Sequence, residues 1–277
     1  MSESILHPPE TQFRTPPDTN QPYDDHMLVI NNVSKTFHTG LNALAKTDFI
    51  LDQGEFVSFV GPSGCGKSTL LRIIAGLLTP TEGSIQCPGL SKEKCSMGFV
   101  FQDAHLLPWR TAQRNVELLL EVAGKSKSER QRLSRETLDR VGLKGFEDAY
   151  PRQLSGGMKM RVSLARTLVL QPRLFLMDEP FAAVDEMTRH TLNEDFLALQ
   201  RDAGFSTLFV THSVSEAVFM STRVIVMTCR PGRIIADIPI PFDRDRTPEL
   251  RSSAAFAELC GVVSKTLWEG ESTCPAN

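Results

Sequence analysis

The sequence predicts an α/β fold built around a mainly parallel sheet. Short apolar runs of strand length alternate with longer amphipathic stretches along most of the chain. A glycine-rich segment, GPSGCGKST, stands between one such run and a helical stretch. Strands that alternate with helices in this way form parallel sheets covered on both faces. A length of 277 residues and an apolar content of 41% are sufficient for a large core.

The individual elements follow from the same patterns. Residues 1–26 hold five prolines among polar side chains, which is typical of a disordered tail. A helix-rich segment covers about 111–170 and includes a charged surface helix at 127–141, and another helix runs from about 186 to 202. Strands are expected at 28–33, 44–51, 56–60, 83–87, 97–101, 174–177, 207–210 and 224–227. The face of a last helix is expected to hold Leu250, Ala254, Ala257, Cys260, Val263 and Leu267.

Composition argues against several classes of protein. The formal net charge is −3 with both signs mixed, whereas broad nucleic-acid binding needs a basic surface, so we expect no nucleic-acid partner. The six cysteines are dispersed without zinc-site spacing. No apolar run approaches the roughly 20 residues of a membrane helix, and the N-terminus lacks a signal-peptide pattern. We therefore expect a soluble chain on the cytosolic side of any membrane.

The glycine-rich segment fits the phosphate-loop pattern of two glycines with four residues between them, followed by Lys and Ser or Thr. Its glycines let backbone N–H groups turn toward phosphate oxygens, and the following helix adds its positive N-terminal end. Lys67 is expected to reach the β and γ phosphates, and the Ser68 hydroxyl to ligate Mg²⁺. An ordinary glycine-rich turn does not explain this pair. The expected nucleotide-binding residues are Gly61, Pro62, Ser63, Gly64, Cys65, Gly66, Lys67, Ser68 and Thr69.

A second acidic site follows an apolar strand in the segment RLFLMDEP. Asp178 is expected to hold Mg²⁺, directly or through water, and Glu179 to polarise the attacking water as general base. Solvated strand ends often carry acids, so the pair alone is weak evidence. With a phosphate loop upstream, it predicts nucleotide hydrolysis.

Two further polar residues stand at strand ends. Gln102 is placed to reach Mg²⁺ or the attacking water, and His212 to contact the γ-phosphate, although a surface Gln and a strand-end His are ordinary alternatives. Both gain weight from LSGGM, in which Ser155 caps a helix and Gly156 and Gly157 allow close backbone approach. This helix start is a second anion site. Both sites within one chain remain possible, but a head-to-tail dimer explains them more naturally.

These ordered elements resemble the ATP-binding subunits of ABC transporters over about residues 27–240. The resemblance implies a P-loop NTPase fold of the ABC ATPase type, with an antiparallel β subdomain and a helical signature subdomain. The expected domains are an ABC ATPase domain at 27–245, with its helical part at about 103–170, and a C-terminal helical extension at 246–277. ATP and Mg²⁺ are the implied cofactors.

The resemblance also implies residue roles. Phe37 matches the aromatic residue that stacks on adenine, the alternative being a strand-edge core residue. Ser155, Gly156 and Gly157 match the signature that contacts the γ-phosphate of the opposite subunit, and Asp185 matches the Asp at the dimer seam. Residues after Gln102 match the loop that receives a helix of the membrane subunit.

Two segments, QDAHLLPWRTAQRNV and RPGRI, are similar to the nitrate, sulfonate and taurine importer branch. Trp109 in the first is expected to be an interface anchor rather than a buried loop anchor. The branch implies a homodimer, integral-membrane permease subunits and, indirectly, a solute-binding protein. It also implies a peripheral location on the cytoplasmic face of a bacterial inner membrane.

Three residues, Met158, Ala182 and Ser213, differ from those that the family usually carries at these positions. None of the differences removes a catalytic group, so we expect an active ATPase. The alternative function is a non-transport ABC ATPase that acts on DNA or ribosomes. Chromosome and repair members carry long coiled coils between the phosphate loop and the signature, and no sustained heptads occur here. Ribosome-associated members usually join two cassettes in one chain, and this sequence has one. A small-molecule kinase would leave LSGGM unexplained.

Overall fold

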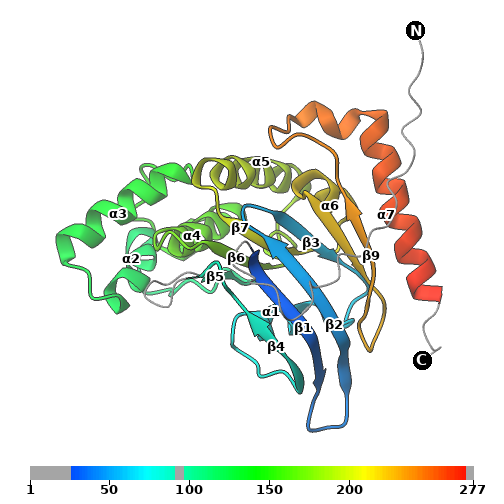
Figure 1. Cartoon of the computed structure of the whole chain (residues 1–277). Helices are drawn as coiled ribbons and strands as arrows, with labels where there is room; N and C mark the ends of the chain where they lie inside the picture. Colours follow the sequence, from blue (N-terminus) through cyan, green and yellow to red (C-terminus); the bar gives the residue numbers. More distant parts are fainter. Residues whose placement is uncertain (1–25, 91–96, 273–277) are drawn as a thin grey trace. The chain divides into compact units, whose positions relative to one another are not determined.

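The computed structural model describes residues 26–90 and 97–272 (Figure 1). Of the polar tail expected at 1–26, only His26 is described, and it begins the first strand. The chain divides into two compact units, which are described separately. Unit 1 comprises residues up to Pro88 and from Val210 onward, and unit 2 comprises Gly89–Phe209.

Unit 1 contains an antiparallel sheet of three strands in the order β2-β1-β4. In the centre of this sheet, Val29 lies opposite Ile50 on one neighbour and Gln86 on the other. The antiparallel sheet expected from the family resemblance is therefore present. Its strands are β1 (His26–Thr36), β2 (Asn42–Asp52) and β4 (Glu82–Gln86).

A second set of strands in unit 1 has the order β3-β8-β9. Strand β3 (Phe56–Val60) runs parallel to β8 (Arg223–Met227), and β9 (Ile234–Pro239) is antiparallel to β8. Every residue of β3 and β8 is buried, as in a sheet covered on both faces. The sequence analysis missed β9, because a charged residue, Asp237, occupies a buried position of this strand.

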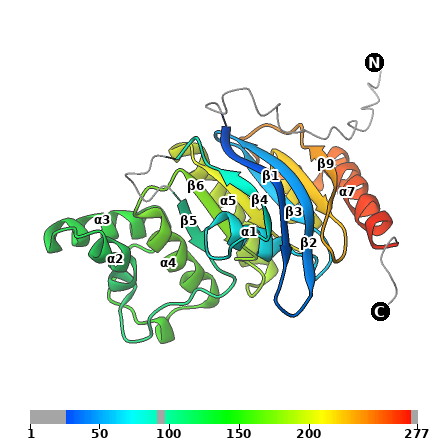
Figure 2. The same ribbon diagram turned by 60° about the horizontal axis from the view of Figure 1, so that its bottom comes forward.

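The helices of unit 1 are α1 (Lys67–Ile74), α6 (Val214–Met220), the 3₁₀ helix η2 (Pro248–Ser252) and α7 (Ala254–Ser272). In Figure 2, α7 lies alongside β9. The last helix expected from the sequence is present, but its expected apolar face is only partly buried, with Val263 buried and Cys260 and Leu267 half-buried. Ala254 and Ala257 are exposed, and Leu250 belongs to η2. The buried residues include Phe256, Leu259 and Val263, since these larger side chains remove more apolar surface from water.

Unit 2 combines strands in the order β5-β6-β7 with a group of helices. Strands β5 and β6 are parallel, with Gly98 opposite Phe175. The strands are β5 (Met97–Val100), β6 (Leu174–Asp178) and β7 (Ser206–Val210), of which Val210 falls in unit 1. The helices are α2 (Ala112–Val122), α3 (Lys127–Arg140), the 3₁₀ helix η1 (Pro151–Gln153), α4 (Gly156–Leu168) and α5 (Glu186–Ala203).

Local capping explains where the helices of unit 2 begin. Thr111, Ser126, Ser155 and Asp185 precede α2, α3, α4 and α5, and each side chain accepts a hydrogen bond from the backbone N–H three residues on. Helices α2, α3 and α4 lie together in both ribbon views (Figures 1 and 2). Within the described ranges, no helix is both long and apolar enough to cross a membrane.

Candidate nucleotide-binding and hydrolysis site

The phosphate loop in unit 1 connects β3 to α1 through left-handed glycines. Gly64 and Gly66 have φ values of 75° and 101°. A Cβ atom on Gly66 would lie 2.7 Å from the carbonyl oxygen of Ala43. Both this close approach and the positive φ require glycine at this position. Lys67 is only 4% exposed, and its ammonium donates to the carbonyl oxygens of Gly61 at 2.7 Å and Pro62 at 2.9 Å. The cation is therefore held inside its own loop.

The connection between β8 and β9 braces this loop. The backbone of Gly232 bonds to Ala43 and Ala45 at 3.1 and 3.0 Å, and Arg230 Nε donates to the carbonyl of Gly64 at 3.2 Å. A Cβ atom on Gly232 would lie 1.9 Å from the carbonyl oxygen of Cys65. The sequence analysis used RPGRI only as a sign of the importer branch. It missed these contacts with the phosphate loop and β2, because the partners are far apart in the sequence.

His212 also belongs to unit 1, where it is exposed between β7 and α6. Hydrogen bonds hold the residues before and after it, Thr211 and Ser213. Thr211 bonds through its hydroxyl to the carboxylate of Glu216, and the backbone N–H of Ser213 donates to the same hydroxyl at 3.0 Å. Ser213 also caps α6 by accepting from the N–H of Glu216 at 3.3 Å. Ser213, one of the three departures from the family pattern, therefore has a structural role.

Phe37, the expected adenine-stacking residue, lies in unit 1 in the turn that follows β1. The side chain is half-buried, and the ammonium of Lys35 lies 5.5 Å from the ring centroid. Backbone bonds between Phe37 and residues Gly40 and Leu41, both 2.9 Å long, close the turn. The ring is thus held on a tight turn rather than in the core.

In unit 2, Asp178 and Glu179 follow a fully buried strand. All five residues of β6 are buried, and Asp178 at its end is 6% exposed. Glu179 is half-buried and has a φ of 49°, in the left-handed region that residues other than glycine rarely adopt. Such strained backbone clusters at functional sites, which supports a role for this turn in chemistry.

Gln102 is exposed in the loop after β5, and two side chains hold this loop. Arg166, on α4, donates to the carbonyl oxygens of Ala104 and His105, both at 2.9 Å. Asn115, on α2, accepts from the N–H of Leu107 at 2.8 Å. Burial lowers the pKa of Arg166. The sequence analysis missed Arg166 and Asn115, although Arg166 lies on the helix that the signature begins.

Ser155, which starts this helix, is exposed. Its hydroxyl oxygen accepts the N–H of Met158 at 3.2 Å, which leaves the hydroxyl proton available for a further acceptor. The bond uses the Met158 backbone, so the side-chain departure at this position does not affect it. Gly156 has open space where a Cβ would be, whereas a Cβ on Gly157 would lie 2.6 Å from Cγ2 of Thr188.

Thr188 belongs to the first turn of α5, which Asp185 caps by accepting its N–H at 3.0 Å. This backbone bond is the main reason that the pKa of the Asp185 carboxyl is lowered. Because Gly157 lies against Thr188, the starts of α4 and α5 are neighbours. The expected signature residues and the expected seam residue are therefore adjacent within unit 2.

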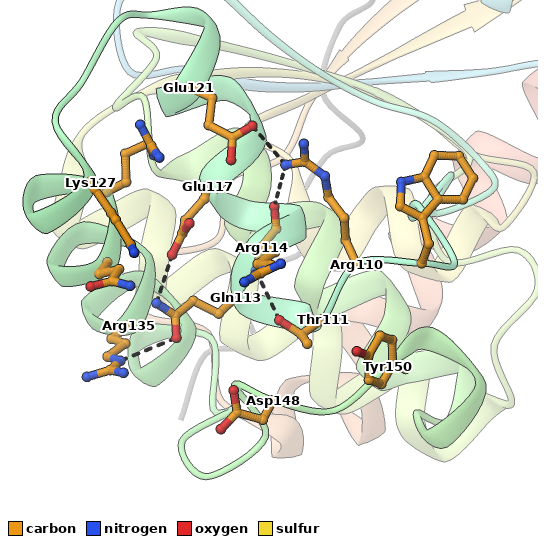
Figure 3. Close-up of a pocket in the computed structure, with 13 residues that line it drawn as sticks. Arg110, Thr111, Gln113, Arg114, Glu117, Glu121, Lys127, Arg135, Asp148 and Tyr150 are labelled. Carbon is orange, nitrogen blue, oxygen red and sulfur yellow. Dashed lines mark hydrogen bonds and ion pairs between the residues drawn. The ribbon is translucent and has the colours of Figure 1, made fainter.

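A polar pocket of about 570 Å³ lies between α2, α3 and residues 148–150 (Figure 3). Arg110 forms an ion pair with Glu121 at 2.9 Å, and Gln113 donates to Glu117 at 2.8 Å. Trp109 also lines this pocket and is 71% exposed. The alternative of a buried loop anchor for Trp109 is thus wrong.

The comparisons with known proteins assign the family. The family described as ABC transporter matches residues 44–182. An uncharacterised ABC transporter ATP-binding protein of Methanocaldococcus jannaschii is 46% identical over 236 residues, which are 83% of this chain and 87% of the relative. The chain belongs to the ABC transporter family. It is therefore an ABC-type ATPase, and the family expected from the sequence is confirmed.

Two relatives of this ABC ATPase carry importer names. The nitrate import ATP-binding protein NrtD of Synechocystis is 45% identical over 233 residues, or 81% of this chain and 88% of the relative. The taurine import ATP-binding protein TauB of Yersinia pestis is 42% identical over 207 residues, or 74% and 81%.

A solved structure confirms the fold class. The chain is similar to the dimeric, post-hydrolysis structure of the ATP-binding cassette MJ0796 bound to ADP and Pi. The TM-score is 0.68 and the identity 33%, and the match covers 78% of this chain and all of that one. The α/β fold predicted from the sequence is that of an ABC ATPase cassette.

Proposed function

We propose that this ABC ATPase is the ATP-hydrolysing subunit of a bacterial importer. Two copies close around two ATP molecules and drive uptake of nitrate, a sulfonate such as taurine, or a similar small solute through a separate membrane subunit. The observation that carries the proposal is the identity of 45% and 42% to nitrate and taurine import subunits over more than four fifths of their length.

For the chemistry, we propose a division of roles among the site residues. Lys67 neutralises the β and γ phosphates, and Glu179 takes the proton of the attacking water. His212 contacts the γ-phosphate, and Phe37 stacks on adenine. The left-handed glycines of the loop support phosphate binding, because they turn the backbone around an anion. The remaining loop contacts come from Gly61, Pro62, Ser63, Gly64, Cys65, Gly66, Ser68 and Thr69.

We propose that Ser68, Gln102 and Asp178 hold Mg²⁺. A hydroxyl, an amide carbonyl and a carboxylate are the hard oxygen donors that this ion prefers, so the residues fit the metal. The bound ion would neutralise charge on the γ-phosphate. The position of Asp178 at the end of the buried strand β6, directly before the strained backbone of Glu179, supports the assignment.

We propose that Ser155, Gly156, Gly157 and Asp185 serve the ATP of the partner subunit. Ser155 and Gly156 are exposed, and the Ser155 hydroxyl keeps a proton to donate. The similar MJ0796 cassette is described as a dimer. The neighbouring starts of α4 and α5 also support this role, because two helix N-termini together favour negative charge.

The permease is proposed to dock beside Trp109. An exposed tryptophan next to charged groups is the composition expected of an interface anchor. Docking would place the ATPase on the cytoplasmic face of the inner membrane. The proposed domain limits remain 27–245 for the ATPase, with a helical part at about 103–170, and 246–277 for the C-terminal extension.

The test is purification of the full chain from its native membranes, with identification of the integral-membrane subunits that accompany it. The complex is then placed in proteoliposomes with ATP inside, and uptake of nitrate, taurine and a longer alkanesulfonate is measured with the matching solute-binding protein outside. A Lys67→Ala complex is the control. ATP-dependent uptake of one of these solutes is expected. Recovery of the chain with DNA or ribosomes, and without a membrane subunit, would contradict the proposal.

A further inference from the structure

Arg246 holds the end of α6 from the C-terminal part of unit 1. It lies beyond β9, and its guanidinium donates to the carbonyl oxygens of Val218 at 3.0 Å, of Phe219, and of Ser221 at 2.6 Å. These carbonyls belong to the last turn of α6 and to its C-cap residue, where helices leave acceptors without intrahelical partners. A cation at this end also complements the helix dipole. Burial lowers the pKa of Arg246 to about 10, so the side chain stays charged at neutral pH.

A second arginine contacts the same last turn of α6. Arg251, in η2, places its guanidinium carbon 3.4 Å from the centroid of the Phe219 ring, within range of a cation–π interaction. Helix α7 then packs against α6. Arg246 and Arg251, here called the C-terminal clamp, therefore fix the last turn of α6 through hydrogen bonds and an aromatic contact.

The other end of α6 carries His212. The helix has only seven residues, and it begins two residues after His212. The bond between Thr211 and Glu216 crosses from the residue before His212 into the helix. Seven residues span roughly 10 Å, so a displacement at the clamped end cannot be absorbed along the helix before it reaches His212.

We propose that the C-terminal clamp positions His212, so that the segment after β9 sets the turnover of the ATPase. Arg246 and Arg251 are positioning residues that act through α6, and neither contacts the nucleotide. The inference rests on the proposed role of His212 at the γ-phosphate. It assigns a function to the C-terminal extension, which neither the fold nor the comparisons explain.

The first test compares Arg246→Gln with Arg244→Gln in the full chain. Arg244 lies two residues away and is exposed. Among the described residues, no hydrogen bond joins it to α6. Arg246→Gln should lower kcat about 10-fold or more, because small displacements of catalytic groups have large effects, while ATP affinity changes less than about twofold. Arg246→Lys should recover part of the loss. Arg244→Gln should match the wild type.

A double-mutant cycle separates positioning from general destabilisation. If the clamp acts through His212, adding Arg246→Gln to His212→Ala should not lower kcat further. An equal fold-loss in both backgrounds, or an unchanged kcat for Arg246→Gln, would overturn the clamp. Should Arg246→Gln fail to fold, Arg251→Met replaces it, since Met retains an apolar side chain beside Phe219.

The imidazole NMR signals of His212 give a readout independent of turnover. Arg246→Gln should shift them, and Arg244→Gln should not. Unshifted signals would overturn the inference even if kcat falls. If His212→Ala keeps wild-type turnover, the proposed role of His212 and the clamp's effect on turnover both fail. If His212→Ala lowers kcat and the double variant loses the product of the two single fold-losses, only the proposal that the C-terminal clamp positions His212 is rejected.

Discussion

Arg223 on β8 and Asp237 on β9 form a buried, bidentate ion pair. Nε and Nη2 of Arg223 donate to the two carboxylate oxygens at 3.0 and 2.6 Å, and the two residues are 5% and 6% exposed. Nη1 of Arg223 also donates to Glu55 at 2.8 Å. Burial would by itself lower the pKa of Arg223, but these carboxylates outweigh it and raise the pKa. This ion pair therefore joins β9, the strand that the sequence analysis missed, to β8 in addition to their backbone pairing.

We expect Arg223→Met to lower the free energy of unfolding by about 3–5 kcal/mol, because it removes the cation that pairs with the buried carboxylate of Asp237 and the half-buried carboxylate of Glu55. Urea denaturation followed by circular dichroism measures this. The control is Lys46→Met, which breaks the exposed pair between Lys46 and Glu82 and should cost less than about 1 kcal/mol. Equal losses in the two variants would mean that the Arg223 network does not hold the sheet.

Glu179→Gln should keep ATP binding but lose about 10²-fold or more in hydrolysis, because the amide cannot accept the proton of the attacking water. With hydrolysis blocked, ATP should trap a dimer that elutes early in size-exclusion chromatography. Turnover at the wild-type rate would remove Glu179 from the role of general base.

Mixing a Ser155→Arg chain with a Lys67→Ala chain tests whether each site is shared between two subunits. Each variant alone should be nearly inactive, because both of its composite sites are damaged. In a mixed dimer both lesions fall in one site, and the other keeps an intact Lys67 and an intact Ser155. Trapping of one ATP equivalent per mixed dimer is therefore expected. No trapping above that of the single variants would count against shared sites.

Gly232→Ala should weaken ATP binding about 10-fold, because the new methyl group would meet the carbonyl oxygen of Cys65 at 1.9 Å and displace the phosphate loop. Titration with a fluorescent ATP analogue measures the affinity. Gly261→Ala provides the matched control, since this helical glycine has no neighbour within 4 Å of the added atom. If Gly232→Ala binds as tightly as Gly261→Ala, the β8–β9 connection does not shape the loop.

The features that could be predicted from the sequence are those encoded over a few residues. Gly61 and Gly66 mark the phosphate loop by their spacing, and Ser155 and Asp185 mark helix starts by their capping chemistry. Strand β9 was missed because a buried Asp237 is acceptable only opposite Arg223, which no local pattern reveals. The expected face of α7 is only partly buried for a similar reason, since the partners that cover Phe256 and Leu259 do not lie on that helix.

The contacts that position the site were harder to predict because their partners are far apart in the chain. Arg166 reaches residues about 60 positions earlier, and Arg246 reaches carbonyls 25 to 28 positions earlier. A lone arginine in a polar loop carries no sign of such a target. The roles of the site residues therefore remain predictions that the variants above test.

The brace on the phosphate loop has a consequence for biosynthesis. Arg230 and Gly64 are separated by 166 residues, so the ribosome completes the loop long before it makes its support. A nascent chain that has emerged only as far as α6 holds the phosphate loop without the β8–β9 connection. The growing polypeptide should therefore become competent for nucleotide only after the β8–β9 connection has left the ribosome, when ATP can begin to stabilise a newly folded domain.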